Sequence, residues 1–512
     1  MPALPPNELL ARHLEEATKV ARHHIIQGKH LPQRTRQNLL SRGCLFEIVK
    51  GWYALVPPGT RTGDTALWHG HFWNFLALYL NDRFGDDYCL SAEASIDLWA
   101  GSTTTPKQMI IMIKAGGAGV TELAHGTSLV TYRDSDRFPE EKAKIQNLYV
   151  MARGMALART SASHYQNDPI STQLVLKEAS GAELAKEILR YGKTASANRI
   201  VGALLAMEEN AKAREIIAAL EVAKFPVKPE NPFQAPALIT GATVVRSPYA
   251  GRIQAMWAQM RDQVIESFPP PPKPIGSPQD YLAQVEEIYN HDAFNSLSIE
   301  GYRVTPDLIE RVRTGRFDEQ NELDKKQIDA LAALGYRKAF KAVEASLASI
   351  LNGEAPGQVA ERDLQGWYQA LFSPAVEAGF VPTHALAGYR DRRVFITNSM
   401  HVPPPKEAVT DAMEALFALL KEERHPGVRA VLGHFAFVFI HPYSDGNGRI
   451  ARFLMNAMMA GDGYPWTIIR LERRTEYMAA LEEASVRNNV GPFSKFVAEE
   501  MQVDWSKVPK RT

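Results

Sequence analysis

One stretch near the C-terminus, Phe435–Arg452, constrains the fold of this chain more than any other part. An apolar segment, Phe435–Ile440, leads directly into His-Pro-Tyr-Ser-Asp-Gly-Asn-Gly-Arg. Pro442 cannot continue a helix, and Gly446 and Gly448 allow backbone angles and close approaches that a Cβ would block. The pattern therefore predicts a buried helix, a tight turn and a second helix that begins near Gly448.

The polar residues of this stretch suit phosphate chemistry. The free N–H groups at the start of the second helix would form an anion hole, reinforced by the helix dipole. Asp445 is a hard oxygen ligand of the kind that holds Mg²⁺ against phosphates. Arg449 and Arg452 share one helix face and can fork onto neighbouring phosphates. An unperturbed imidazole titrates near neutrality, which makes His441 the candidate general base for a hydroxyl nucleophile.

Each feature alone has a structural interpretation, because helix-end histidines, Gly-Asn-Gly turns and arginine pairs are common. Their joint occurrence favours function. The sequence His441-Pro-Tyr-Ser-Asp-Gly-Asn-Gly-Arg-Ile-Ala-Arg452 resembles the Fic family signature, His-Pro-Phe-x-(Asp/Glu)-Gly-Asn-Gly-Arg-x-x-Arg. It departs only at Tyr443, where Phe is usual, and Tyr should fill the same position if its hydroxyl finds a partner. The resemblance spans roughly residues 248–496 and implies a mainly α-helical Fic-type bundle with a β-hairpin flap.

The resemblance also implies a reaction: transfer of AMP from ATP to a Ser, Thr or Tyr hydroxyl of a target protein, with pyrophosphate leaving. His441 would take the hydroxyl proton and Asp445 would hold Mg²⁺ between the α- and β-phosphates. Such transfers depend on positioning and electrostatic stabilisation. The nucleotide-binding residues implied are Gly446, Asn447, Gly448, Arg449, Arg452 and Tyr477, the last at a position that lines the adenine pocket in relatives. A tyrosine at helical spacing is also typical of a core, and His434 is interpreted as structural.

Upstream, Ser296-Leu-Ser-Ile-Glu-Gly301 resembles the inhibitory motif of the family, (Ser/Thr)-x-x-x-Glu-(Gly/Asn). A helix that ends at Gly301 places Ser296 and Glu300 on one face. A Glu300 carboxylate presented to Arg452 would form the ion pair that Arg452 otherwise offers to the γ-phosphate. Glu300 is therefore the predicted inhibitory residue, and the sequence leaves open whether it also supports AMP removal.

Between these motifs, Gly388–Thr397 resembles the family's flap, a hairpin whose exposed strand edge docks an extended target segment through main-chain hydrogen bonds. The structural alternative is an ordinary edge hairpin. The segment precedes Pro403-Pro-Pro405 and an amphipathic helix predicted over 406–420.

The sequence pattern of the N-terminal region predicts a winged-helix-like fold. Leu9–Ile26 and Arg34–Arg42 have helical patterns, and Leu45–Val56 is typical of a hairpin that turns at Lys50-Gly51. The phrase Gly43-Cys-Leu-Phe-Glu-Ile-Val-Lys-Gly-Trp-Tyr53 resembles AbiEi-type antitoxin and regulator proteins over roughly the first 230 residues. Under that resemblance Arg34, Arg36 and Arg42 would face DNA phosphates. The alternative is a solvated surface helix.

Pro-rich segments indicate where the chain divides into domains. We predict a winged-helix-like domain at 1–90, an α+β and helical regulatory region at 91–224, a linker at 225–247 and a Fic catalytic domain at 248–500. Within the first part, 108–115 and 127–132 are expected as strands and 171–223 as helical. A second Pro-rich segment, 268–274, is expected between two helices.

Composition limits the functional classes. Among 512 residues, Lys plus Arg and Asp plus Glu both number 58, so no whole-molecule charge draws the chain to nucleic acid or an anionic membrane. Cys44 and Cys89 are too few for a disulfide framework, and the start lacks a signal-peptide pattern, so we expect a cytoplasmic protein with no membrane segment.

Alternatives to the adenylyltransferase stay open from sequence. One is a DNA-binding regulator whose Fic-like half only senses nucleotide. Others are transfer of another group such as UMP, phosphoryl transfer as in the Doc branch, or removal of the modification. The intact Gly448 and both arginines favour a triphosphate donor. The target, its modified residue and any homo-oligomer are not specified by the sequence.

Overall fold

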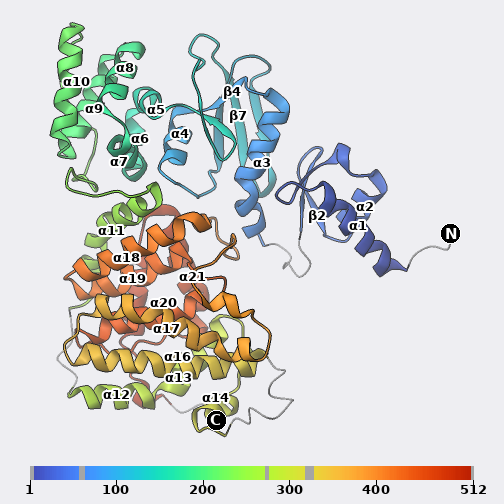
Figure 1. The fold of residues 1–512 in the computed structure, drawn as a ribbon, viewed down its shortest axis with the longest axis vertical. Coiled ribbons are helices and arrows are strands. Elements are labelled where there is room, and N and C mark those ends of the chain that lie inside the picture. The colour runs from blue at the N-terminus through green and yellow to red at the C-terminus, as the bar shows by residue number, and fades with distance from the viewer. Residues whose placement is uncertain (1–4, 57–63, 271–275, 317–327, 509–512) are drawn as a thin grey trace. The chain divides into compact units, whose positions relative to one another are not determined.

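The computed structural model describes residues 5–56, 64–270, 276–316 and 328–508. The chain forms two compact units, one of Met1–Val244 with Phe395–Val402 and the other of Val245–Val394 with Pro403–Thr512 (Figure 1). Within the described residues, no helix combines the length and apolar character needed to cross a membrane.

The first unit opens with two helices and a small antiparallel sheet of order β1-β3-β2. The turn at Lys50-Gly51 joins β2 to β3 as predicted, and Gly51 supplies the positive φ of 83°. Two helices with a small sheet make this the α+β region that the sequence predicts. Its elements are α1 (Pro6–Val20), β1 (Ile25–Gln27), η1 (Gly28–His30), α2 (Gln33–Ser41), β2 (Leu45–Val49) and β3 (Trp52–Leu55).

The predicted helix over Leu9–Ile26 is wrong at its C-terminal end. α1 stops at Val20, and His23 and His24 both adopt positive φ angles, 51° and 64°. Arg22 and Ile25 exchange two backbone hydrogen bonds of 2.9 Å across these histidines, which reverses the chain. Ile25 and Ile26 then pair with β3 instead of continuing the helix.

A second sheet, of order β4-β5-β7-β6, forms the centre of the first unit. β5 and β7 run parallel, at the two positions where strands were predicted. Ser91 caps α4 by accepting a hydrogen bond from Ala94 N. The four strands are β4 (Tyr88–Leu90), β5 (Gln108–Ile113), β6 (Gly119–Glu122) and β7 (Ser128–Arg133). This part of the unit also contains α3 (Ala66–Phe84), α4 (Ala92–Trp99), η2 (Ala124–Gly126) and a separate two-stranded sheet of β8 (Ala143–Ile145) and β9 (Leu148–Val150).

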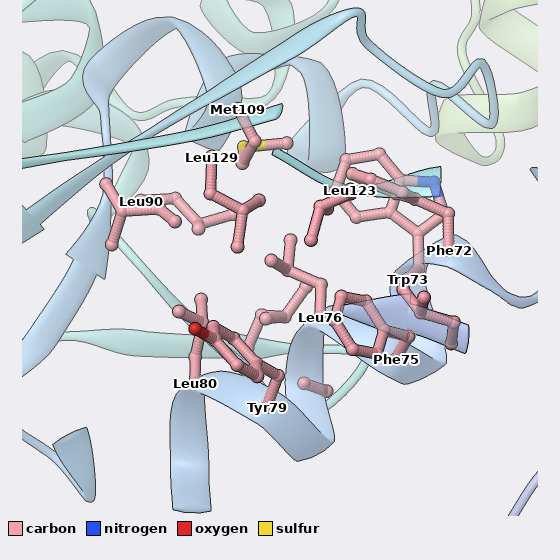
Figure 2. Close-up of a cluster of buried hydrophobic side chains, with 14 of the residues drawn as sticks. Phe72, Trp73, Phe75, Leu76, Tyr79, Leu80, Leu90, Met109, Leu123 and Leu129 are labelled. Atoms are coloured by element: carbon pink, nitrogen blue, oxygen red, sulfur yellow. The ribbon is translucent and has the colours of Figure 1, made fainter. Parts of the chain in front are cut away.

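The core of this unit forms where α3 packs on the sheet. Figure 2 shows Phe72, Phe75 and Leu76 of α3 facing Leu90 of β4 and Leu129 of β7. Both cysteines, Cys44 and Cys89, are free thiols. The rest of the unit is helical, as expected for 171–223. These helices are α5 (Arg153–Arg159), α6 (Ala162–Asn167), α7 (Pro169–Glu178), α8 (Gly181–Tyr191), α9 (Thr194–Ala206) and α10 (Asn210–Val222).

The second unit is a helical bundle built around α19 and α20, which pack on each other and are almost entirely buried. α16 and α17 pack against α20 (Figure 1). The Pro-rich segment 268–274 joins α11 to α12 as expected, although residues 271–275 lie outside the described residues. The helices are α11 (Pro248–Ser267), α12 (Pro278–Glu287), α13 (Tyr289–Ile299), α14 (Pro306–Arg313), α16 (Ile328–Leu351), α17 (Pro356–Glu377), η3 (Thr383–Leu386), η4 (Lys406–Ala408), α18 (Val409–Glu422), α19 (Pro426–Ile440), α20 (Asn447–Ala460), η5 (Leu471–Arg473), α21 (Arg474–Arg487), α22 (Gly491–Glu500) and η6 (Trp505–Lys507).

The predicted β-hairpin at Gly388–Thr397 is wrong in its secondary structure. This segment, called the flap below, contains no strand. Its backbone is bonded elsewhere: Arg390 N donates to Pro442 O at 2.9 Å. The flap backbone therefore contacts the loop that follows α19, and two flap strands do not pair with each other.

Candidate active site

The end of α19 places His441 at the edge of the bundle core. α19 is apolar on all sides and buried along its length, because Phe435, Phe437 and Phe439 fill the surrounding space. His441 closes the helix in the left-handed conformation, with φ 52° and ψ 59°. This backbone conformation is strained for a residue with a Cβ, and residues with such strain cluster at functional sites.

The imidazole of His441 is half-buried, and its hydrogen bonding fixes its tautomer. Its Nδ1 lies 3.3 Å from Val438 O. A carbonyl only accepts, so Nδ1 carries the hydrogen and Nε2 keeps its lone pair. Burial, together with the nearby Arg390 cation, lowers the pKa of His441 to about 4. The ring is therefore neutral at pH 7.

The loop 441–446 is braced by Asn447. Its Oδ1 accepts from Tyr443 N at 2.9 Å and its Nδ2 donates to Tyr443 O at 2.8 Å. The predicted anion-hole role of Asn447 is thus limited to its backbone, since the buried amide side chain is fully used by the loop. Gly446 has a φ of 80°, and a Cβ there would come within 2.7 Å of the Phe372 ring.

The first turn of α20 faces a carboxylate. Among the described residues, no acceptor bonds the N–H of Asn447 or Gly448, as is usual for the start of a helix. Glu300 lies over this turn, since a Cβ on Gly448 would approach its Oε1 to 2.3 Å. An anion thus already occupies the helix N-terminus where a phosphate was predicted to bind.

Glu300 and Ser296 both bind Arg452. α13 ends at Ile299, and Gly301 follows with a φ of 92°, as the inhibitory motif predicts. Arg452 Nη2 donates to Glu300 Oε1 at 2.7 Å, and Arg452 Nε donates to Ser296 Oγ at 2.9 Å. Burial opposes the charge of Arg452, yet Glu300 beside it raises the pKa above its ordinary value.

Arg449 and Asp445 form the other side of the loop. The Arg449 guanidinium is buried between the rings of Tyr302 and Phe372, at 5.0 and 5.2 Å from their centroids. Its Nη2 lies 3.4 Å from Asp445 Oδ1, and its Nε has no hydrogen-bond partner among the described residues. Asp445 itself is largely exposed, although its Oδ1 also accepts a hydrogen bond from Gly446 N at 2.6 Å.

Tyr443, the residue that departs from the signature, has a hydrogen-bond partner for its hydroxyl. Its hydroxyl donates to Gln365 Oε1 at 2.7 Å, and its ring stacks on Tyr368 with centroids 3.7 Å apart. The aromatic position beneath the loop is therefore filled and its added polar atom is satisfied, as the sequence required.

Tyr477 lies in the core. It is 1% exposed, its hydroxyl is 2.8 Å from His434 Nε2, and its ring lies beside Phe493 and Phe496. His434 is the structural residue that was expected. The adenine-pocket role of Tyr477 stays a prediction.

Two residues of the site escaped the sequence interpretation. Tyr302 directly follows the inhibitory motif, and its hydroxyl lies 3.5 Å from Asp445 Oδ2. Arg390 lies in the flap and bonds the backbone of His441. Nothing in the local pattern marks either residue, because their partners are 143 and 51 positions away.

These contacts bring together most of the residues that the sequence analysis singled out, and part of the chain is similar to known proteins. The model of the Fic/DOC family matches residues 358–459, from α17 to the end of α20. This part of the chain is similar to the Fic/DOC family. The loop 441–446 and the N-terminus of α20 lie within the matched part.

Curated relatives of the Fic domain share a name. The protein adenylyltransferase Fic of Nematostella vectensis is 41% identical over 114 residues, 22% of this chain and 26% of the relative. That of Drosophila grimshawi is 29% identical over 219 residues, 42% of this chain and 41% of the relative. The chain thus spans less than half the length of these relatives.

Solved structures with similarity to the chain include a fragment of Fic-1 from C. elegans, residues 134–508. It has 17% identity and a TM-score of 0.37, and the match covers 64% of this chain and 89% of that one. A Fic domain containing signaling protein from Bacteroides thetaiotaomicron has 19% identity and a TM-score of 0.35, covering 48% and 92%.

Proposed function

We propose that this chain is a protein adenylyltransferase that transfers AMP from ATP to a hydroxyl of a target protein. One observation carries the proposal: a neutral His441, the unpaired amides of α20 and Arg452 all converge on the loop 441–446, with a carboxylate where phosphates would lie. A base, an anion-binding helix terminus and a guanidinium are the groups that phosphorus chemistry requires.

In the proposed reaction the target hydroxyl oxygen attacks the α-phosphorus. The bond from that phosphorus to the α,β-bridging oxygen breaks, pyrophosphate leaves, and the hydroxyl proton passes to Nε2 of His441. The amides of Asn447 and Gly448 bind the phosphate oxygens, and Arg452 binds the γ-phosphate once Glu300 has withdrawn. The protein itself forms no covalent bond to the nucleotide, so its contribution is positioning and charge stabilisation.

Asp445 fits a magnesium ion in this proposal. It is an exposed carboxylate at the edge of the phosphate site, and Mg²⁺ in proteins is commonly held by one or two carboxylates plus substrate phosphates. A bound Mg²⁺ would neutralise charge on the phosphates. Arg449, buried beside Asp445, supplies a second positive charge on the same side of the loop.

Glu300 keeps the enzyme inhibited in the described conformation. Its carboxylate occupies both the α20 N-terminus and Arg452, so ATP can bind productively only after this side chain moves. We place the docking of the target segment along the flap. The flap forms no strand and its Arg390 N–H donates to Pro442 O, so an incoming segment would pair with the other main-chain groups of the flap.

A DNA-binding regulator is less well supported. Arg36 of the predicted recognition helix donates to Gly28 O at 2.9 Å and lies over the Tyr53 ring, so it serves the fold. Arg34 and Arg42 are exposed, and the net charge of the chain is zero. A phosphate-binding surface requires clustered cations.

Intact-mass spectrometry tests the proposal. The Glu300→Gly protein is incubated with Mg²⁺ and, separately, ATP, GTP, UTP or CTP, alone and with a lysate as target source. We expect a mass gain of one AMP with ATP, and none when His441→Ala is added. A gain of one phosphate would instead identify phosphoryl transfer, and no gain with any nucleotide would contradict the proposal.

A further inference from the structure

Arg390, in the flap, is a buried arginine whose hydrogen bonds go only to backbone carbonyls. It is 6% exposed. Its Nε donates to His441 O at 2.8 Å and its Nη1 to Arg392 O at 3.1 Å. Its Nη2 donates to Pro404 O at 2.5 Å and to Ile440 O at 3.5 Å. No carboxylate within the described residues forms a salt bridge with this guanidinium.

The C-terminus of α19 explains how a buried charge is stabilised without a carboxylate. Ile440 and His441 contribute the last carbonyls of that helix, which carry the negative end of the helix dipole. Burial lowers the pKa of Arg390 to about 10, so the group remains charged at neutral pH. The guanidinium thus satisfies carbonyls that the helix end leaves unpaired.

The same contacts fix the residue that follows α19. His441 has a φ of 52°, a conformation that an L-residue resists. Arg390 holds this peptide from two directions: its side chain binds His441 O, and its backbone N–H donates to Pro442 O at 2.9 Å. The turn that aims the imidazole is therefore secured by a residue 51 positions earlier in the chain.

We propose that Arg390 is a positioning residue for the His441 imidazole, and that its planar guanidinium, by joining the end of α19 to the flap and to the Pro404 backbone, keeps His441 aligned with the phosphate site. The inference rests on the proposed function of His441 as general base. Arg390 itself does not touch the reacting atoms.

Arg390 also sets the charge next to the imidazole. The charged groups that face His441 are Arg390, Glu300 and Asp445. Arg390 favours the neutral ring and the two carboxylates favour the protonated ring. Removing the guanidinium charge therefore raises the pKa of His441 and moves the acid limb of the pH–rate profile to higher pH.

Two variants separate geometry from charge, both made in the Glu300→Gly protein. Arg390→Lys keeps a positive charge, but an ammonium cannot span four carbonyls in one plane. Arg390→Met removes the charge and keeps the apolar stem. For both we expect kcat to fall about 10- to 100-fold, the range caused by small misplacement of a reacting group, with KM for ATP changed less than about twofold.

Arg429 provides a matched control. It lies on the first turns of α19, is also buried, donates to Glu423 O at 3.0 Å and pairs with Asp462. His441 is 12 residues farther on, about 18 Å along a helix axis. Arg429→Met should lower the midpoint of thermal unfolding but leave kcat, measured on the folded fraction, unchanged.

Titration of His441 by NMR gives a readout that needs no activity. We expect its pKa to rise in Arg390→Met, to stay near the parent value in Arg390→Lys, and to be unmoved in Arg429→Met. An unmoved pKa in Arg390→Met, or a kcat loss no larger than that of Arg429→Met, would overturn the inference. If no variant or parent transfers nucleotide yet the titrations behave as expected, the positioning of His441 stands and only the proposed reaction fails.

Discussion

Glu300 Oε1 accepts a hydrogen bond from Arg452 Nη2 at 2.7 Å while its carboxylate also covers the first turn of α20 at Gly448. One side chain thus blocks two anion-binding groups at once. The arginine is 5% exposed and the glutamate 26%, so the pair is only partly screened by solvent. Removing Glu300 should therefore change both activity and stability.

Glu300→Gly should raise the rate of AMP incorporation at least about tenfold. A tenfold increase requires the activation free energy to fall by only about 1.4 kcal/mol when the inhibitory contact is removed. Glu300→Gln, which keeps the size but loses the charge, should give an intermediate rate. Incorporation of label from α-³²P-ATP measures this. Glu310→Gln is the matched control, since Glu310 pairs with Arg313 on α14 away from the site. Equal rates for the parent and Glu300→Gly would refute inhibition by this residue.

Glu300→Gly should also destabilise the free protein, by roughly 1 to 3 kcal/mol, because a buried guanidinium loses its carboxylate. A non-hydrolysable ATP analogue should restore more stability to this variant than to the parent, since its phosphates replace the missing anion. Urea unfolding with and without the analogue measures both effects. Equal stabilisation of the two proteins would show that nucleotide does not compete with Glu300.

His434 should make stability fall in acid. Burial lowers the pKa of His434 to about 3, against 6.5 for the free side chain. Below pH 6.5 the unfolded chain takes up a proton that the folded chain refuses, so stability is lost as pH falls. Between pH 6.5 and 4 the loss should approach about 3 kcal/mol. In His434→Gln the unfolding free energy should vary less with pH over this window. Parallel pH profiles for parent and variant would contradict the assignment.

Asp292 should make stability fall as pH rises, which is opposite to the effect of His434. It is fully buried, Tyr336 donates to it at 2.6 Å, and burial raises its pKa from 3.8 to about 6. The folded state therefore holds a proton that the unfolded state releases, and stability falls as pH rises through this range. Relative to the parent, Asp292→Asn should gain roughly 2.5 kcal/mol between pH 4 and pH 7. Denaturant titrations at both pH values measure the difference, and a pH-independent difference would exclude a raised pKa.

Tyr443→Phe should retain activity. The ring continues to stack on Tyr368, and the cost is about 1 kcal/mol for the hydrogen bond to Gln365, whose amide oxygen is left unpaired. Tyr443→Ala should lose both stability and activity, because the loop loses its aromatic support. Combining Tyr443→Phe with Gln365→Leu should cost less than the sum of the two single changes. Additive costs in thermal unfolding would mean that the two side chains do not interact.

Short-range features of this protein were predictable from sequence. The apolar run before His441, the helix-stopping Pro442 and the Gly-Asn-Gly turn specify a helix, a loop and a second helix through local backbone rules. The cap at Ser91 and the turn at Gly51 follow for the same reason. Where local preferences were ambiguous, prediction failed: α1 ends at Val20 because His23 and His24 form a left-handed turn that their residue types only weakly favour.

The sequence by itself determined that the proposed base, the proposed metal ligand and the two arginines lie within one helix–loop–helix segment. Only the tertiary structure decided which distant groups meet them. Glu300 reaches Arg452 across 152 positions, and Arg390 reaches His441 across 51. Such contacts depend on how helices pack around a shared core, whereas periodicity and turn signals report only on neighbours in the chain. The flap likewise contains no strand, and its Arg390 side chain instead donates to the carbonyls at the end of α19.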